Sequence, residues 1–233
     1  PYGIILIAGP TGAGKSTTLA AIITQIHQGE YGSIITLEQP IEYVFPQGKG
    51  YVRQREIPYS SESFVNGVRE ALRQDPDVIL VGEVRDKATA NAALQAADSG
   101  HLVFSTLHTG SAVETVSRLA NWYPQEERNK LRSDLAGNLK YVLTQQLLPK
   151  KDGKGRVLAL EIFRSSPAAS HLIIEEKEQQ QLRSYMQSQQ KAGCLLMDDH
   201  ILSLYQKGVI SGETALMYSH HKEVIRNSLF RSE

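Results

Sequence analysis

The octapeptide GPTGAGKS, residues 9–16, matches the pattern G-x-x-x-x-G-K-[ST]. Its glycines let successive backbone N–H groups turn inward around phosphate oxygens, and the positive end of a following helix attracts the same anion. Lys15 would reach the terminal phosphates, and the Ser16 hydroxyl would bind Mg²⁺. The segment therefore predicts a nucleotide phosphate site formed by Gly9, Pro10, Thr11, Gly12, Ala13, Gly14, Lys15, Ser16 and Thr17. A fortuitous glycine turn is the alternative.

Glu83 is the first candidate for the carboxylate that such a site needs. A phosphate loop requires a carboxylate at the end of another strand to hold the metal or its water. Within PDVILVGEVRD, Glu83 follows the apolar run 78–81 after one glycine, and ligands of open α/β sheets bind at the carboxyl ends of strands. The structural alternative is a plain ion pair between Glu83 and Arg85.

Two further carboxylates, Glu38 and Glu42, lie in the segment ITLEQPIEY, residues 35–43. Pro40 lies between them and argues against a regular helix, so we do not expect both on one helix face. One of them is then free to face the nucleotide while the other faces the backbone. Beside a phosphate loop both become candidate site residues. The alternative is a solvated acidic loop.

His108 is the last residue but one of the segment LVFSTLHT, residues 102–109, and lies at the same predicted sheet edge as the glutamates. We interpret it as a sensor that donates a hydrogen bond to the γ-phosphate and loses that bond after hydrolysis. His101 lies seven positions earlier, and an odd separation on an extended segment points two side chains to opposite faces. The two histidines are therefore not expected to chelate one metal. The alternative is a buried histidine that caps a turn with Thr106 or Thr109.

Strands that alternate with helices must position these residues. Apolar runs predict strands over 4–8, 33–37, 77–81 and 102–107, with a short one over 51–54. Helical spacing predicts helices over 15–29, 64–72 and 88–97. This alternation is typical of a parallel sheet with helices on both faces. The phosphate segment lies between a strand and a helix, which is the context that its mechanism requires.

The second half of the chain changes character near residue 165. We predict a helix at about 126–142, followed by a hairpin of strands 144–148 and 157–163 around the polar tip PKKDGKG. After Pro167 only short helices with polar linkers are predicted. The sequence therefore predicts a core domain over 1–164 and a small helical subdomain over 165–233.

Composition restricts the classes of protein and of site. The 233 residues are 41% hydrophobic and 21% charged, as in ordinary globular proteins. Lysine plus arginine equals aspartate plus glutamate at 25 each, so no net charge attracts a nucleic acid, and none is expected as a partner. The single cysteine, Cys194, allows neither an internal disulfide nor a cysteine-rich zinc site, which indicates a reducing compartment.

The location and extent of the chain follow from the same observations. Its most apolar stretches are far shorter than the ~20 residues of a membrane helix, and no signal peptide is recognisable. We therefore expect a cytoplasmic protein without a transmembrane segment. The chain starts at Pro1 and enters a predicted core strand almost at once, so we expect it to be the C-terminal portion of a longer protein.

Four segments in this order resemble the motifs of one family: GPTGAGKST, TLEQPIEYV, ILVGEVRD and GHLVFSTLHT. They are similar to the Walker A, Asp box, Walker B and His box of the secretion-type hexameric ATPases, which drive type IV pili and type II secretion. The resemblance runs from Tyr2 to about Leu216. Assembly ATPases of this superfamily typically carry a four-cysteine zinc insert, so the chain resembles instead the PilT-type branch that retracts pili. The resemblance implies an α/β fold with a RecA-like P-loop core and a small all-helical C-terminal part.

The resemblance also implies a role for each matching residue. Glu42 would be the general base on water, Glu83 the carboxylate that organises Mg²⁺ and water, and His108 the γ-phosphate contact, with Glu38 beside the nucleotide. Candidates for charge-stabilising contacts to a neighbouring subunit's nucleotide are Arg55, Arg69, Arg73 and Arg85. The chain departs from the family pattern at Gln39, where an aspartate is usual, and over 167–176, where the retraction motif's arginine is missing.

At the level of assembly, the resemblance implies a ring, expected to be a hexamer, that hydrolyses ATP with Mg²⁺ and powers type IV pilus retraction for twitching motility. It also implies a PAS-like domain upstream and an inner-membrane platform protein as partner, which would hold the motor at the membrane periphery. Two alternatives remain open. One is a regulatory or weakly catalytic nucleotide-binding subunit of a pilus or secretion system, and the other is a type IVB secretion or conjugation ATPase.

Overall fold

A seven-stranded mixed sheet forms the centre of the computed structural model, which describes residues 2–29 and 32–230. The strand order is β3-β2-β4-β5-β1-β6-β7, and all neighbours are parallel except β6 and β7. The predicted α/β fold is therefore confirmed. The strands are β1 Gly3–Ala8, β2 Ser33–Glu38, β3 Tyr51–Glu56, β4 Val78–Val81, β5 Leu102–Leu107, β6 Leu139–Pro149 and β7 Arg156–Arg164.

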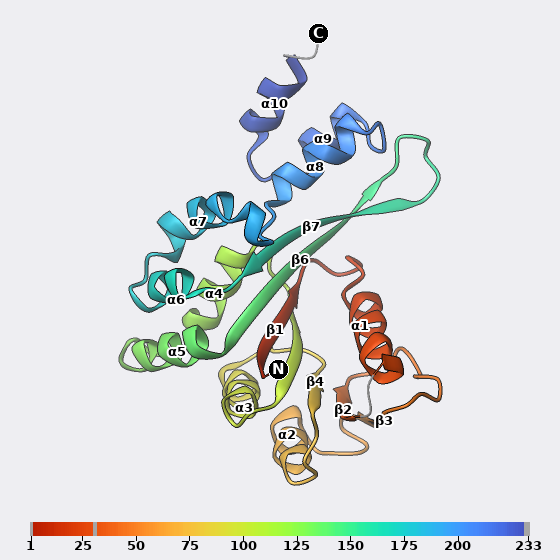
Figure 1. Ribbon diagram of the computed structural model, residues 1–233, viewed down its shortest axis with the longest axis vertical. Helices are drawn as coiled ribbons and strands as arrows, with labels where there is room; N and C mark the ends of the chain where they lie inside the picture. The colour runs from red at the N-terminus through yellow and green to blue at the C-terminus, as the bar shows by residue number, and fades with distance from the viewer. Residues whose placement is uncertain (1, 30–31, 231–233) are drawn as a thin grey trace.

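Helices connect these strands and continue after the last one (Figure 1). A π-helical turn, Glu178–Leu182, and a 3-10 turn, Gln190–Ala192, interrupt the later helices. Within the described residues, no helix combines the length and the apolar character needed to cross a bilayer. The α-helices are α1 Lys15–Gly29, α2 Phe64–Leu72, α3 Lys87–Asp98, α4 Ala112–Asn121, α5 Gln125–Asn138, α6 Pro167–Ile174, α7 Arg183–Ser188, α8 Met197–Gln206, α9 Gly212–Tyr218 and α10 Lys222–Phe230.

Side chains of the central strands alternate between two hydrophobic layers, as the period of a strand requires. One layer packs against α1 and contains Ile7, Leu19, Ile23, Ile34, Val78, Leu80 and Phe104. The opposite layer packs against α2, α3, α4 and α5 and includes Leu6, Leu37, Ile79, Val81, Val103 and Leu107. Burial on both faces explains why these strands read as continuous apolar runs.

The parallel register brings four strand ends to one edge of the sheet. Ala8 at the end of β1 pairs with Leu107 at the end of β5, and Val81 at the end of β4 pairs with Ser105. On the other side of β4, Leu37 of β2 pairs with Val81. The segments that leave β1, β2, β4 and β5 therefore begin side by side.

The predicted helix at about 126–142 is wrong at its C-terminal end. Helix α5 ends at Asn138, and Leu139 already pairs with Ile4 as the first residue of β6. Leu139 and Val142 are buried at 1% and 0% exposure, because pairing with β1 overrides the helical spacing that the local sequence displays. The predicted hairpin is confirmed, and its strands are longer than predicted.

Helix α4 was not predicted from the sequence, although its segment carries a signal for the start of a helix. Ser111 caps the helix, because its hydroxyl accepts the Glu114 backbone N–H at 3.1 Å. The Glu114 carboxylate in turn accepts the Gly110 N–H at 2.6 Å. This reciprocal pattern closely follows the capping-box signature S-x-x-E, with the carboxylate bound one residue earlier than usual.

Two separate hydrophobic clusters hold the C-terminal helices. Residues of α6 and α7, such as Ala169 and Met186, pack into the large cluster that the sheet forms with α2, α3, α4 and α5. Helices α8, α9 and α10 form a second cluster with Leu148 and Ala159 of the β6–β7 hairpin, beside whose outer part they lie in Figure 1. A subdomain boundary near residue 165 stays a prediction, and α8–α10 are the helices with a cluster of their own.

A buried ion pair ties α5 to the turn after α6. The Arg132 guanidinium contacts both oxygens of Glu178 at 2.9 Å and the Ile173 carbonyl at 2.9 Å, and its Nε lies 3.1 Å from Glu176. The side chains of Arg132 and Glu178 are 8% and 2% exposed. Each charge therefore depends on the other for its compensation.

We predict that Arg132→Met destabilises the protein, because it leaves the Glu178 carboxylate buried without its cation. The expected cost is about 3–5 kcal/mol. For a chain of this size, this corresponds to a fall in melting temperature of about 6–20 °C. Thermal unfolding followed by circular dichroism measures it. Lys130→Met, an exposed change on the same helix, is the control and should cost less than ~0.5 kcal/mol. Equal melting temperatures for the two variants would contradict the assignment.

Candidate nucleotide site

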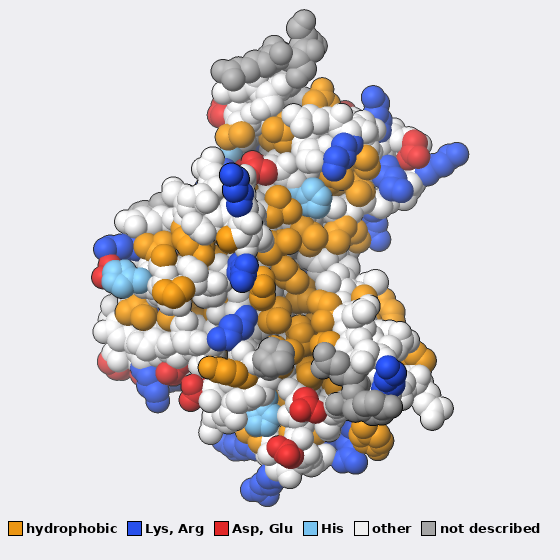
Figure 2. Space-filling model, in the orientation of Figure 1, with side chains coloured by type: hydrophobic (Ala, Val, Ile, Leu, Met, Phe, Trp, Pro, Cys, Tyr) orange, Lys and Arg blue, Asp and Glu red, His pale blue; other side chains and the backbone are white. Residues whose placement is uncertain are grey.

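A cleft of about 460 Å³ opens where the ends of β1, β2, β4 and β5 meet. Figure 2 shows the molecule hollowed between the β6–β7 hairpin and α1, with hydrophobic side chains gathered there. Of the predicted site residues, those that line the cleft are Thr11, Gly12, Ala13, Gly14, Lys15, Ser16, Thr17, Glu38, Glu42, Glu83 and His108. Gly9 and Pro10 instead lie at the base of the loop, against Lys15, and Arg85 does not line the cleft.

The phosphate loop has the backbone that its glycines predict. Gly12 and Gly14 have φ values of +77° and +88°, a conformation that other residues rarely adopt. Gly9 has φ +142°, and a Cβ there would lie 2.4 Å from the Gln145 carbonyl oxygen of β6. Only glycine therefore allows the loop to leave β1 this close to β6.

Lys15 begins α1 inside the loop and is 9% exposed. Its Nζ donates to the carbonyl oxygens of Gly9 at 2.8 Å and Pro10 at 3.1 Å. Burial lowers the pKa of the Lys15 ammonium, while the carboxylates of Glu83 and Glu42 raise it. The lysine is thus held at the floor of the cleft with two carboxylates facing it.

The backbone on either side of Glu83 is held by hydrogen bonds to the two strands that flank β4. The neighbouring Gly82 donates its N–H to the Leu37 carbonyl of β2 at 2.8 Å, and Val84 donates to the Thr106 carbonyl of β5 at 3.0 Å. The Thr106 hydroxyl donates to the Gly82 carbonyl at 2.7 Å. The Glu83 side chain is 15% exposed and pairs with Arg85. Since Glu83 also lines the cleft, the ion pair does not exclude a place in the site.

His108 lines the cleft and has a half-exposed side chain, with 54% of its surface open. Its Nε2 lies 3.8 Å from a Glu83 oxygen. The hydroxyls of Thr106 and Thr109 bond elsewhere, to Gly82 and Thr115. The alternative of a buried, turn-capping histidine is therefore wrong for His108. The His101 side chain, by contrast, makes local hydrogen bonds to Ser99 and Ala96.

Glu38 and Glu42 reach the cleft from two kinds of structure, a strand end and a loop. Glu38 is half-buried at the end of β2, where Oε1 accepts the Thr36 hydroxyl at 2.6 Å and the Gln54 amide at 3.0 Å. Glu42 is exposed on an irregular loop, as Pro40 predicted. That loop docks on α1, because the hydroxyls of Tyr43 and Thr17 lie 2.8 Å apart.

The oxygen donors present fit a magnesium ion that accompanies a nucleotide. Mg²⁺ prefers carboxylate, hydroxyl and phosphate oxygens, and it is usually held by one or two protein groups together with substrate phosphates. The Ser16 hydroxyl and the Glu83 carboxylate line the same cleft. These two groups are the chain's candidates to hold the ion.

Some residues of the cleft were not found by sequence reasoning. Leu147 and Arg156 enter from the β6–β7 hairpin, far along the chain from the phosphate loop, and no local signal marks them. Aromatic side chains at 43, 45 and 64 line the cleft as well. Among the arginines proposed to act across subunits, Arg55 instead pairs with Glu70 at 2.7 Å in this chain.

We predict that the pKa of His108 lies below its ordinary value of 6.5 in the nucleotide-free protein. Burial is the largest cause, the Lys15 charge lowers the pKa further, and the Glu83 carboxylate raises it. Lys15→Met should therefore raise the pKa of His108, and Glu83→Gln should lower it. The ring is then neutral at pH 7 and has one N–H to donate.

Histidine-labelled NMR, titrated over about pH 5 to 8, measures this pKa, since neutral and charged imidazoles differ in that range. His108→Gln identifies the signal by its loss. A His108 titration midpoint above the ordinary value, or one that neither substitution moves, would contradict the prediction.

Comparison with known proteins agrees with the geometry. The chain matches the type II/IV secretion system protein family over residues 1–228. It is 45% identical to a twitching motility protein of Neisseria gonorrhoeae over 223 residues, which are 96% of this chain and 59% of that protein. It is 46% identical to the type IV pilus retraction ATPase PilT of Pseudomonas aeruginosa over 215 residues, which are 92% of this chain and 62% of that protein.

A solved structure shares the fold. The crystal structure of the pilus retraction motor PilT with bound ADP superposes with a TM-score of 0.90 at 43% identity, and the match covers 97% of this chain and 64% of that one. The chain thus spans about three-fifths of the length of these relatives. With a family match across almost its whole length and close structural agreement, the chain belongs to the type II/IV secretion system protein family.

Proposed function

We propose that this chain is the ATPase part of a motor that hydrolyses ATP with Mg²⁺ and powers type IV pilus retraction. One observation carries the proposal: a phosphate loop, three carboxylates and a half-exposed histidine face one cleft. The identity of 45–46% to proteins of twitching motility and pilus retraction supports the type of work that hydrolysis drives.

Each group has a distinct task in this proposal. The phosphate loop and Lys15 bind the triphosphate, and Glu42 accepts the proton of the attacking water as general base. Glu83 orients that water, and with Ser16 it would hold Mg²⁺, which neutralises charge on the phosphates. His108 donates a hydrogen bond to the γ-phosphate. Since Glu42 is exposed on a loop, its position depends on the contact between Tyr43 and Thr17.

The free energy needed to close a subunit favours a ring in which subunits share contacts to the nucleotide. Moving a subunit from almost fully open to almost fully closed needs ~5.5 kcal/mol of differential binding. A hydrogen bond to a charged phosphate contributes only about 1.5–3 kcal/mol. His108 alone therefore cannot drive closure. Contacts from Lys15, Mg²⁺ and a neighbouring subunit's arginines would supply the rest, and Arg85, an exposed side chain that pairs with Glu83, remains a candidate.

We further propose a hexamer in the cytoplasm that works against a platform protein of the inner membrane. The predicted core over 1–164 and helical subdomain over 165–233 would both belong to each subunit of this ring, and α6 and α7 would move with the core because they share its hydrophobic cluster. A regulatory, weakly catalytic subunit is the second candidate. It is favoured by Gln39, which lines the cleft beside Glu38 at the position where the family usually carries aspartate.

We expect Glu83→Ala and Glu42→Gln each to reduce the rate of phosphate release about 100-fold or more, because general acid–base groups contribute roughly 10²–10⁴-fold. Nucleotide affinity should change little, since the phosphate loop stays intact. Phosphate release and binding of a fluorescent ATP analogue measure the two effects.

Two variants calibrate this experiment. Glu126→Gln, an exposed carboxylate at the start of α5, should keep the full rate. Lys15→Ala should lose binding itself. An unchanged rate in both glutamate variants would remove the proposed catalytic roles, and a wild-type protein that binds ATP but releases almost no phosphate would favour the regulatory subunit.

A further inference from the structure

Glu161 of β7 is a buried carboxylate outside the nucleotide cleft, with 5% exposure. Its two oxygens accept hydrogen bonds from two different parts of the chain. Oε1 accepts the Ala112 backbone N–H at 2.8 Å, and Oε2 accepts the Met197 N–H at 3.4 Å. Ala112 and Met197 are the first residues of α4 and α8. One side chain therefore binds the starts of two helices.

The α4 contact lies at the end of the loop that carries His108. Strand β5 ends at Leu107 and α4 begins at Ala112, so only four residues, 108–111, lie between them. The loop is braced internally, because the Thr109 and Thr115 hydroxyls lie 2.7 Å apart and Thr115 donates to the Ser111 carbonyl at 2.8 Å. A shift of Ala112 would therefore be transmitted to His108 through a short, stiff segment.

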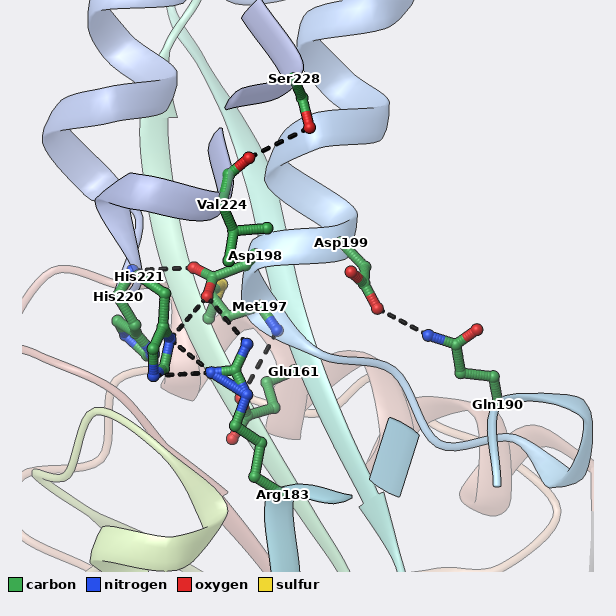
Figure 3. A network of polar contacts seen from close by, with 10 residues as sticks. All are labelled: Glu161, Arg183, Gln190, Met197, Asp198, Asp199, His220, His221, Val224 and Ser228. Carbon is green, nitrogen blue, oxygen red and sulfur yellow. Dashed lines mark hydrogen bonds and ion pairs between the residues drawn. The ribbon is translucent and has the colours of Figure 1, made fainter. Parts of the chain in front are cut away.

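The α8 contact leads into the C-terminal helices. Asp198, next to Met197, is 3% exposed and lies 3.4 Å from Arg183. Figure 3 draws this contact. Asp198 accepts the His220 backbone N–H at 2.8 Å and contacts the His221 ring at 2.8 Å (Figure 3). The start of α8 thus binds α7 and the segment before α10. A displacement of any of these helices would shift the start of α8, and with it the Met197 N–H that Glu161 accepts.

Burying a charged Glu161 carboxylate at this position costs free energy. Burial raises the pKa of Glu161, and the hydrogen bonds from Ala112 and Met197 lower it, as does the nearby His220. The positive ends of two helices offset part of the cost of burying a carboxylate. If either helix start moved away, an oxygen would lose its donor while still buried. The carboxylate therefore favours the arrangement in which both helix starts are in place.

We propose that Glu161 is a positioning residue of the nucleotide site, which joins the His108 loop and the start of α8 so that a shift of one moves the other. The inference rests on the proposed ATPase function for its effect on turnover. The coupling between the His108 loop and the start of α8 requires only that nucleotide binds. Binding of nucleotide at His108 then alters the first turn of α8, and movement of the C-terminal helices alters His108.

Glu161→Gln tests the proposal with little change in shape. A carboxamide can accept one of the two N–H groups, but it presents an NH₂ group to the other donor. Hydrogen–deuterium exchange of the wild-type chain is measured with and without Mg²⁺ and a non-hydrolysable ATP analogue, which keeps the γ-phosphate that His108 would contact. Exchange at residues 109–113 and 197–201 should be slower when the analogue is bound. In Glu161→Gln the response at 197–201 should disappear while the phosphate loop stays protected.

Kinetics provide the second readout. Turnover of Glu161→Gln should fall about tenfold, which is smaller than the loss of a group that touches the reacting atoms. The affinity for a fluorescent nucleotide should stay within about twofold, since nothing in the phosphate loop changes. If Glu161 only stabilised the fold, the substitution would lower the melting temperature, and turnover would not fall more than nucleotide affinity.

Glu178→Gln is the matched control, because Glu178 is also a buried carboxylate, but its cation partner is Arg132 of α5. It should lower the melting temperature and keep both the exchange response at 197–201 and the turnover. Three results would overturn the inference: no exchange response at 197–201 in the wild type, a full response in Glu161→Gln, or an equal loss in Glu178→Gln. A wild type that binds nucleotide without releasing phosphate would refute the proposed function alone, since the exchange experiment still decides the coupling.

Discussion

The pairing of β4 between β2 and β5 is the constraint on which the cleft depends. Hydrogen bonds from both neighbours continue beyond the end of β4, so Gly82 and Val84 are held although the strand has ended. Glu83 lies between these two anchored residues and has little backbone freedom. A catalytic carboxylate has to keep its place to a fraction of an ångström, and a side chain between two fixed peptide groups meets this need without a scaffold of its own.

The β6–β7 hairpin connects this rigid edge to the C-terminal helices. On one side it approaches the phosphate loop so closely that only glycine fits at position 9, and it supplies Leu147 and Arg156 to the cleft. On the other side, Leu148 and Ala159 anchor the cluster of α8–α10. Neighbouring residues of the same strands thus face two different environments. The hairpin is therefore a direct structural connection between the phosphate loop and the cluster of α8–α10.

The sequence predicts the parts of the site that are local in the chain. The phosphate loop, Glu83 and His108 each follow an apolar run, and a parallel sheet must bring such residues to one edge. Arg156 and Glu161 could not be found in this way, because their importance comes from contacts with residues about 50 to 150 positions away. The end of α5 was misjudged for the same reason, since β1 decides that Leu139 is in a strand.

In the proposed motor, the free energy of a step would have to come from several contacts. Lys15 and His108 would contact the nucleotide. Glu161 joins α4 and α8, and Asp198 binds the helices beyond. Each contact contributes only a few kilocalories per mole at most. In the proposed coupling, loss of either donor would leave a buried oxygen of Glu161 unpaired, so the joint would have few intermediate arrangements of low energy. A small shift at the phosphate would then become a choice between two positions of the helices.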